Sequence, residues 1–392
     1  MKHNWRRVSL KEVCNKITDG SHNPPKRVEI SDYLMLSSKN IFDDTIILDS
    51  PRFLTESDFK AEDRRTQVEV GDVLLTCVGT IGRVAVVNEG LPKFTLQRSV
   101  AVLKNKRDVI DSRFLMFSLQ NILDELTENA RGVAQKGLYL GQIQSLEIPI
   151  PTLNEQQRIV SILDDAFAGI ARATANADKN LANARELFLS YLKSVFENKG
   201  EDWEMKRLGD IGKPSMCKRI LKHQTSSTGD IPFYKIGTFG KTPDAFISKE
   251  KYHEFRTKYS FPKKGDILIS ASGTIGRRVR YDGEPAFFQD SNIVWIDNDE
   301  MQVLNDYLYV FYEFCDWQPS KGATISRLYN TNLISIKIVF PKSFNEQKRI
   351  VHKLDALSTE TKRLEAIYQQ KLNALEELKK SILNQAFSGK LQ

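Results

Sequence analysis

Two stretches of the chain carry apolar residues at the spacing of long α-helices. In the stretch that begins near Asn154, apolar or small residues recur in heptad order, and Thr174 is the one polar member of this seam. The stretch from Asn345 is noisier, because Lys371 and Gln385 fall on its seam. Lengths of about 40 residues correspond to rods of roughly 60 Å. The predicted seam positions are Val160, Leu163, Phe167, Ile170, Thr174, Ala177, Leu181, Ala184, Phe188, Tyr191 and Val195 in the first stretch, and Leu354, Leu357, Leu364, Leu375, Leu378 and Ile382 in the second.

The residues ahead of each long helix follow a different pattern. Short β-branched runs such as GDVLLTCV, GRVAVVN and SVAVLK are separated by glycine, proline and aspartate, which is typical of strands and turns. DSRFLMFSLQNILDELTEN has the periodicity of a helix, and NDYLYVFYEFCDW is its partner later in the chain. This mixture predicts an α+β globular part before each long helix.

The chain is an internal repeat. GDVLLTCVGTIGR returns as GDILISASGTIGR, and three further matched pairs occur in the same order, including the segments that contain NEQQRIV and NEQKRIV. Such ordered self-similarity indicates a duplicated unit, and 392 residues suit more than one domain. The predicted boundaries are a globular domain at 1–150, a helix at 151–200, a second globular domain at 201–341 and a second helix at 342–392.

The start of each long helix has recognisable signals. Pro149 and Pro151 end the preceding strand, Asn154 is the predicted N-cap, and Gln157 stands at the capping-box position, which Lys348 weakens in the second copy. An apolar seam needs a cover, and in a duplicated chain the other copy can supply it. We therefore expect the two helices to pair as an antiparallel coiled coil with pseudo-two-fold symmetry.

Composition narrows the class of protein. Hydrophobic residues make up 41% and charged residues 27%, which is the balance of a globular protein. The net charge of +7 is compatible with a nucleic-acid partner but does not require one. No apolar run approaches the ~18–20 residues of a membrane span, and the N-terminal residues lack the apolar core of a secretory signal. We expect a cytoplasmic protein without a membrane partner.

Cysteine spacing and several short motifs argue against resident chemistry. Cys14, Cys77, Cys217 and Cys315 are too far apart for a metal pair, so no metal site is expected and the thiols are predicted to be buried. KIGTFGKT ends like a Walker A loop but has Lys235 where that loop needs glycine. NPPK at 23–26 is similar to the Asn-Pro-Pro-aromatic motif of amino-methyltransferases, but lysine replaces the aromatic residue, which favours a turn.

The repeated GTIGR phrase has two interpretations. Its glycines suit a tight turn between strands, where positive φ is needed. Arg83 and Arg277 follow the turn and either bind phosphate or guanine, or are ordinary solvated residues at a strand edge. Polar pairs are found after the next strand of each copy, where they either read base edges or form a turn; they are Gln97 with Arg98 and Gln289 with Asp290.

The ordered double set of motifs resembles the specificity subunit of type I restriction–modification enzymes. The resemblance is carried by ITDGSHNPPK, by GTIGR twice, by GDIPFYKIG, and by the two segments IPIPTLNEQQRIVSILD and FPKSFNEQKRIVHKLD. It covers essentially the whole chain. The departures are small: Phe340 replaces the usual isoleucine or leucine of the second closing strand, and Lys348 alters the second capping box.

The resemblance implies a non-catalytic protein. Each globular part would read one half of a split site in double-stranded DNA, and the helices would dock two methyltransferase subunits. Those partners would hold S-adenosylmethionine, so no cofactor is expected on this chain, and restriction subunits that translocate DNA would join the full enzyme. The helix-start residues of the two motifs are the implied partner contacts: Glu155, Gln156, Arg158, Glu346, Gln347 and Arg349.

The two halves differ in most residues outside the repeated motifs, which predicts two different half-sites. DGSHNPPK in the first half has no counterpart in the second, where GKPSMCKRILKHQTSS stands instead. The predicted DNA-contacting residues are Lys26, Arg27, Arg83, Gln97 and Arg98 in the first half and Arg219, Lys222, Arg277, Gln289 and Arg327 in the second. Two alternatives stay open: a helical scaffold that does not read DNA, and a methyltransferase that acts alone through NPPK.

Overall fold

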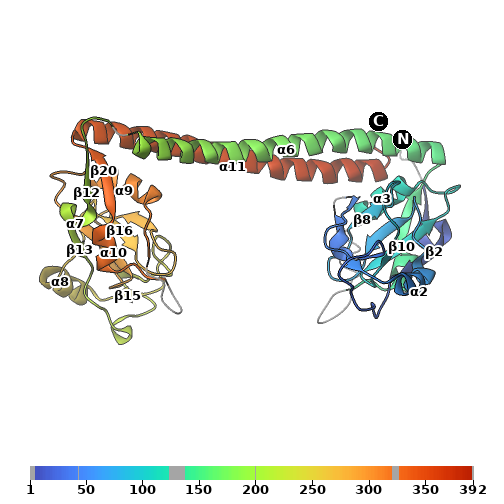
Figure 1. Ribbon diagram of the computed structural model, residues 1–392, viewed down its shortest axis with the longest axis horizontal. Helices are drawn as coiled ribbons and strands as arrows, with labels where there is room; N and C mark the ends of the chain where they lie inside the picture. Colours follow the sequence, from blue (N-terminus) through green and yellow to red (C-terminus); the bar gives the residue numbers. More distant parts are fainter. Residues whose placement is uncertain (1–4, 43, 123–136, 199, 320–325, 391–392) are drawn as a thin grey trace. The chain divides into compact units, whose positions relative to one another are not determined.

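The computed structural model describes residues 5–42, 44–122, 137–198, 200–319 and 326–390. By its contacts the chain divides into two compact units, Met1–Asp178 with Gln369–Gln392, and Lys179–Tyr368. Both division points fall inside two long helices, α6 (Leu153–Glu197) and α11 (Phe344–Phe387), which are labelled in Figure 1. Each unit therefore combines a globular part with one end of each long helix. The domain boundaries predicted from the sequence stay a prediction.

The globular part of the first unit has the expected mixture of strands and helices. Its strands are β1 (Arg6–Ser9), β2 (Cys14–Asp19), β3 (Leu34–Leu36), β4 (Ile41–Phe42), β5 (Thr45–Ile46), β6 (Arg52–Phe53), β7 (Val73–Thr76), β8 (Val84–Val86), β9 (Phe94–Leu96), β10 (Val100–Asn105) and β11 (Glu147–Ile150). Its helices are α1 (Leu10–Val13), the 3₁₀ turn η1 (Ser38–Asn40), α2 (Glu56–Thr66), α3 (Ser112–Asn121) and α5 (Leu140–Ser145).

A four-stranded antiparallel sheet in the order β2-β10-β7-β8 forms the centre of this part. Side chains alternate across it, as strand geometry requires. Val73 and Leu75 of β7 point to the core shared with α3 and the long helices, whereas Leu74 points to the three-stranded sheet β6-β3-β9. Both faces are covered at β7 and β8, which explains why these two strands are apolar at nearly every position.

The second unit has a similar order of elements with different residues, without counterparts of β4 and β5. Its strands are β12 (Trp203–Arg207), β13 (Gly212–Ser215), β14 (Ile231–Tyr234), β15 (Phe246–Ile247), β16 (Ile267–Ser270), β17 (Arg278–Arg280), β18 (Phe287–Phe288), β19 (Ile293–Asn298) and β20 (Lys337–Pro341). Its helices are α7 (Leu208–Ile211), the 3₁₀ turn η2 (Lys222–Gln224), α8 (Lys249–Lys258), α9 (Asn305–Phe314) and α10 (Asn330–Ser335).

The second unit also repeats the sheet topology. The four-stranded sheet has the order β13-β19-β16-β17, and a three-stranded sheet β15-β14-β18 faces it. Ile267 and Ile269 of β16 belong to the core with α9 and the long helices, and Leu268 belongs to the aromatic core on the other side. The duplication seen in the sequence is therefore a duplication of fold.

The predicted helices of the globular parts are present in the described residues. α3 begins after Asp111, whose carboxylate accepts hydrogen bonds from the backbone N–H groups of Arg113 and Phe114. The remainder of the helix predicted for this segment, from residue 123, lies outside the described residues. α9 occupies most of NDYLYVFYEFCDW, and its aromatic side chains enter the core of the second unit.

The first and last strands of each globular part pair with each other. β1 pairs antiparallel with β11, with Arg6 opposite Ile150, and β12 pairs in the same way with β20, with Trp203 opposite Pro341. This pairing brings the end of each globular part back to its beginning, from which the long helix leaves.

The two long helices pair antiparallel within each unit. In the second unit Arg185 of α6 forms an ion pair with Glu365 of α11 at 2.7 Å. The Nζ of Lys353 in α11 lies 4.8 Å from the ring centre of Tyr191 in α6. In the first unit Lys379 lies 5.2 Å from the ring centre of Phe167. Residue numbers thus fall along α11 as they rise along α6, and Figure 1 shows the two helices side by side. The predicted antiparallel pairing is confirmed.

The inner face of the second helix differs from the prediction. Lys371 and Gln385 are exposed, as is Leu378, whereas Ala386 is fully buried and Leu372 is partly buried. The predicted register fails only at these three positions, because Leu354 is buried and Leu357, Leu364, Leu375 and Ile382 are partly buried, as the seam required. In α6, Leu163, Ala177 and Ala184 are buried as predicted.

The start of each long helix also corrects the prediction. α6 begins at Leu153 and the backbone N–H of Gln156 donates to the carbonyl of Thr152 at 2.9 Å, so Asn154 lies inside the first turn and is not the N-cap. α11 begins at Phe344, and Ser343 Oγ accepts from the backbone N–H of Glu346 at 3.4 Å. Thr152 and Ser343 therefore stand at the N-cap positions, and the Ser343 hydroxyl oxygen caps the second helix.

A buried glutamine in the first turn ties each long helix to its globular part. Gln156 Oε1 accepts from the backbone N–H of Asp111 at 2.8 Å, and its Nε2 donates to the carbonyls of Val109 and Pro151, both at 3.0 Å. Gln347 makes the same three contacts with Leu304, Gln302 and Pro341 at 2.9 Å. Both side chains have no exposed surface. The expectation that these two glutamines contact a partner protein is therefore corrected, because they satisfy internal backbone groups.

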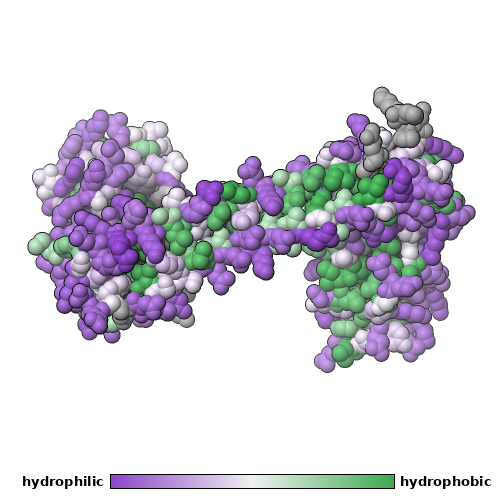
Figure 2. Space-filling model, turned by 90° about the horizontal axis from the view of Figure 1, so that it is seen from above, coloured by the Kyte–Doolittle hydropathy of each residue, from purple (hydrophilic) through white to green (hydrophobic). Residues whose placement is uncertain are grey.

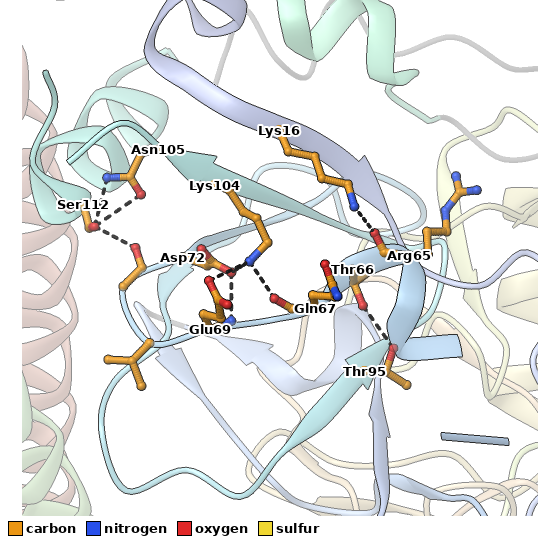
Figure 3. A network of polar contacts seen from close by, with 12 residues as sticks. Lys16, Arg65, Thr66, Gln67, Glu69, Asp72, Thr95, Lys104, Asn105 and Ser112 are labelled. Atoms are coloured by element: carbon orange, nitrogen blue, oxygen red, sulfur yellow. Dashed lines mark hydrogen bonds and ion pairs between the residues drawn. The ribbon is translucent and has the colours of Figure 1, made fainter. Parts of the chain in front are cut away.

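The GD of each repeated phrase is also structural. Asp72 is buried, accepts from the backbone N–H of Glu69 at 2.9 Å and pairs with Lys104 Nζ at 2.8 Å, a network drawn in Figure 3. Lys104 also donates to the carbonyl of Gln67 at 2.6 Å. Asp266 in the second unit accepts from the backbone N–H of Lys263 at 2.7 Å. Burial raises the pKa of both carboxyls. The aspartates close the turn that enters β7 and β16.

We predict that Gln347→Ala destabilises the second unit. The substitution leaves the N–H of Leu304 and the carbonyls of Gln302 and Pro341 without partners in a buried place, at a cost of about 2–3 kcal/mol. Three of the four tryptophans, Trp203, Trp295 and Trp317, belong to this unit, so tryptophan fluorescence in a urea titration measures its unfolding. The exposed neighbour Lys348→Ala is the matched control. An unchanged midpoint for Gln347→Ala would contradict the anchoring role.

Candidate nucleic-acid interface

The repeated GTIGR phrase forms the turn between β7 and β8 and its counterpart between β16 and β17. Gly79 and Gly82 have φ values of 82° and 91°, and Gly273 and Gly276 have 67° and 82°. Thr76 Oγ1 accepts from the backbone N–H of Arg83 at 2.9 Å, and Ser270 Oγ accepts from that of Arg277 at the same distance. The glycines supply the left-handed conformations of a tight turn, which confirms the structural interpretation of the phrase.

The two arginines after these turns have internal partners. Arg83 Nη1 donates to the carbonyl of Ile41 at 3.3 Å, and its guanidinium lies 4.7 Å from the ring centre of Phe42. Arg277 Nη1 donates to the carbonyl of Phe239 at 3.0 Å. Both side chains are partly buried; Arg83 joins its hairpin to β4, and Arg277 joins its hairpin to the loop that contains Phe239. A contact of these arginines with DNA stays a prediction.

A cavity of about 380 Å³, lined by both apolar and charged residues, lies at one end of the central sheet of the first unit. It is bordered by the end of β2, the turn between β9 and β10, the residues after β7 and the start of α5. The side chains of interest in its lining are Asp19, His22, Arg65, Cys77, Arg98 and Tyr139. Of these, only Arg98 was predicted from the sequence to contact DNA, and the tertiary structure gathers the others around it.

Asp19 organises the charged groups of this cavity. Its carboxylate is mostly buried, pairs with Arg65 and lies 2.8 Å from His22 Nε2. Arg65 Nε also donates to the backbone carbonyl of Asp19 at 2.8 Å. Asp19 and His22 belong to the ITDGSH motif, so the sequence held a signal for them, whereas Arg65 comes from the end of α2 and had none. The cavity thus offers hydrogen-bond donors and acceptors side by side.

Cys77 is a neutral member of the lining. Its Sγ donates to the carbonyl of Arg98 at 3.3 Å, and burial raises the pKa of its thiol to about 12. A thiol that stays protonated at neutral pH is a poor nucleophile. Cys14 and Cys217 are buried as predicted and Cys315 is partly buried, and burial raises each of these pKa values to about 12 as well.

The equivalent place in the second unit carries different polar groups. Arg219 Nε pairs with Asp290 at 3.0 Å, and Ser272 Oγ donates to Asn292 Oδ1 at 2.7 Å. Arg327 Nη2 lies 3.4 Å from the carbonyl of Ser291 and from Asn292 Oδ1. The backbone frame is the same, because Val78 pairs with Gly137 in the first unit and Ser272 with Arg327 in the second.

The remaining predicted DNA contacts fall into two groups. Lys26, Arg27 and Lys222 are exposed, and the guanidinium of Arg27 lies 5.9 Å from the ring centre of Phe53. Gln97 is partly buried in the turn before β10. Gln289 Oε1 accepts from the backbone N–H of Ile236 at 2.9 Å, so its amide oxygen takes part in the fold. The structure therefore brings Gln97 and Arg98 together on one edge, and Arg219 and Arg327 near one turn.

The charged residues of the two helix-start motifs lie on the surface as matched pairs. Arg158 makes two hydrogen bonds to Glu155, at 2.8 and 2.9 Å, and Arg349 makes two to Glu346, at 2.6 and 2.7 Å. The Arg349 guanidinium lowers the pKa of the Glu346 carboxyl. Their role as partner contacts stays a prediction.

Within the described part of the chain, no group of three or more His, Cys, Asp and Glu side chains is arranged to hold a metal ion. Among the described helices, none is both long and apolar enough to cross a membrane. The NPPK segment is an irregular, largely exposed stretch, held by Arg52 Nη1 donating to the carbonyl of Pro25 at 2.8 Å.

Comparison with known proteins connects this geometry to one family. The family model described as the type I restriction modification DNA specificity domain matches twice, over residues 2–179 and 200–377. The two matches correspond to the two copies of the repeated fold, each extending into its long helix.

Individual relatives and solved structures agree. A putative type I restriction enzyme specificity subunit of Haemophilus influenzae is 47% identical over 272 residues, covering 69% of this chain and 70% of that protein. The putative MjaX specificity subunit of Methanocaldococcus jannaschii is 26% identical over 99% of this chain and 94% of its own length.

Two solved structures share the fold over nearly their whole length. A chain from a type I restriction–modification system has a TM-score of 0.78 at 22% identity, covering 99% of this chain and 98% of that chain. The HsdS subunit of Thermoanaerobacter tengcongensis has 0.62 at 21%, covering 100% and 98%. With two matched copies and close relatives of this kind, the chain belongs to the family of type I restriction–modification DNA specificity subunits.

Proposed function

We propose that this specificity subunit reads an asymmetric bipartite DNA site, one half with each globular part. The proposal is supported by the polar residues found at the equivalent edge of the two central sheets. The backbone frame is shared, but Asp19, His22, Arg65 and Arg98 line it in the first unit, whereas the second carries Arg219 with Asp290, Asn292 and Arg327. Different donors and acceptors on one frame suit two different base sequences.

The chain directs chemistry that other subunits perform. We propose two methyltransferase subunits as partners, which would hold S-adenosylmethionine and methylate adenine in the cytoplasm, with restriction subunits joining the full enzyme. Apolar residues left exposed on the long helices support a protein-binding role for them; in the second unit these include Leu187, Leu189 and Ile367. Figure 2 shows hydrophobic surface along the helical part as well as on the globular parts.

The first test is a methylation map of the host genome with and without this gene. We expect one split, asymmetric adenine motif to lose its methylation on deletion and to regain it when the gene is restored. Loss of methylation at a symmetric motif would contradict the proposal that the two globular parts read different half-sites. An unchanged map would favour a helical scaffold without DNA readout, and methyl transfer by the purified chain alone would favour the independent methyltransferase.

A second prediction separates the two readers. Arg98→Ala should weaken or relax recognition in one half of the motif, and Arg219→Ala in the other, by about 1–3 kcal/mol for each lost base contact. The measurement is methylation, by the chain with its methyltransferase subunits, of duplexes substituted one base pair at a time. Each variant is the control for the other. Equal effects of either variant on both half-sites would count against separate reading.

A further inference from the structure

Two exposed tyrosines occupy the same place in the two units. Tyr139 and Tyr329 precede α5 and α10, and the two residues are 66% and 53% exposed. Among the described Phe, Tyr and Trp residues they are the two most exposed. An uncovered aromatic ring at one surface position is ordinary, but the same ring at the equivalent position of two divergent units indicates a shared task.

The backbone beneath each tyrosine is held firmly. The preceding leucines, Leu138 and Leu328, are buried, and their N–H groups donate to the carbonyls of Cys77 at 2.8 Å and Ala271 at 2.9 Å. The N–H of Tyr139 donates to Gln142 Oε1 at 3.0 Å, and that of Tyr329 to Asn332 Oδ1 at 3.2 Å. Each ring is therefore presented from a fixed point, which lowers the entropy lost when it binds.

Cationic groups share the cavity with Tyr139, and an arginine precedes Tyr329 by two residues. Tyr139 lines the cavity that also contains His22, Arg65 and Arg98. Tyr329 follows Arg327 by two residues, and the guanidinium of Arg327 lies beside the turn between β18 and β19. Aromatic rings next to arginine and lysine are typical of surfaces that bind nucleic acid, where the cations meet phosphate and the rings meet bases.

The identity of the two tyrosines contrasts with the polar residues beside them. Groups that read particular bases should differ between two different half-sites, and those of the two units do. A stacking ring needs no such difference, because every base has a flat π face. Being exposed, the rings are also not required for the core of either unit. A contact with DNA that is independent of base identity accounts both for the identity of the two tyrosines and for their exposure.

We propose that Tyr139 and Tyr329 each stack on a nucleobase, one in each half-site, and so hold the DNA against the residues that read its sequence. Insertion of a ring at a base step would partly unstack it, as apolar wedges do in other DNA-binding proteins. The inference rests on the proposed reading of a bipartite site and adds to it a contact common to both halves.

The test uses the full chain assembled with its methyltransferase subunits and a duplex that carries the mapped motif. Placing 2-aminopurine at successive positions of one half-site reports unstacking or restacking there as a change in fluorescence. We expect Tyr139→Ala to weaken binding about tenfold or more and to remove the fluorescence change in one half-site only. Tyr139→Phe should keep both properties, because it keeps the ring. Tyr329→Ala should act on the other half-site.

Each other result overturns the inference. Unchanged affinity and fluorescence for both alanine variants would show that neither ring stacks. A loss for Tyr139→Phe equal to that for Tyr139→Ala would assign the effect to the hydroxyl group. Failure of the alanine variants to assemble with the methyltransferase subunits, at an unchanged unfolding midpoint, would assign the tyrosines to a protein contact. Failure of the unaltered complex to methylate the mapped motif would instead reject the proposed function itself.

Discussion

The core of each globular part is completed by residues from both long helices, and the rest of the structure depends on this closure. In the first unit Ile159 and Leu163 of α6 share a core with Leu383, Ala386 and Phe387 from the last turns of α11. The ring centres of Phe387 and Phe114 lie 5.2 Å apart. In the second unit the end of α6, with Leu192 and Phe196, packs with the start of α11. Neither half of the chain can therefore bury its apolar surface without the other.

Because each long helix must enter these cores in a fixed direction, the start of each helix is held by specific buried hydrogen bonds. A glutamine without exposed surface, Gln156 or Gln347, joins the first helical turn to the loop before α3 or α9 and to the proline that ends the preceding strand. Buried side-chain amides of this kind fix direction as well as stability, because each donor and acceptor has one partner position. Each glutamine is flanked by a Glu–Arg pair at the surface, with the glutamate one residue before it and the arginine two residues after it.

The same frame then supports two different surfaces. The GD and GTIGR elements shape a hairpin in each unit with matching hydrogen bonds, so they are constant for reasons of folding. The polar residues at the adjacent sheet edge are free to differ, because they do not take part in the apolar core. The backbone frame is the same in both units, whereas the polar residues at the sheet edge differ. This is the physical basis on which one fold can read two sequences.

The sequence by itself determined the duplication, the α+β class, the two long helices and their antiparallel pairing, since periodicity and repeated motifs are local properties of the chain. It placed Arg83 and Arg277 correctly after a tight turn, but could not show that their guanidinium groups donate to Ile41 and Phe239, which lie far away along the chain. It also could not show that Gln156 and Gln347 are buried, or that α11 turns Ala386 rather than Gln385 inward. Only the tertiary structure decided these points, because burial and side-chain proximity depend on contacts between distant segments. For the same reason, only the tertiary structure could gather around one cavity the residues Asp19, His22, Arg65, Arg98 and Tyr139.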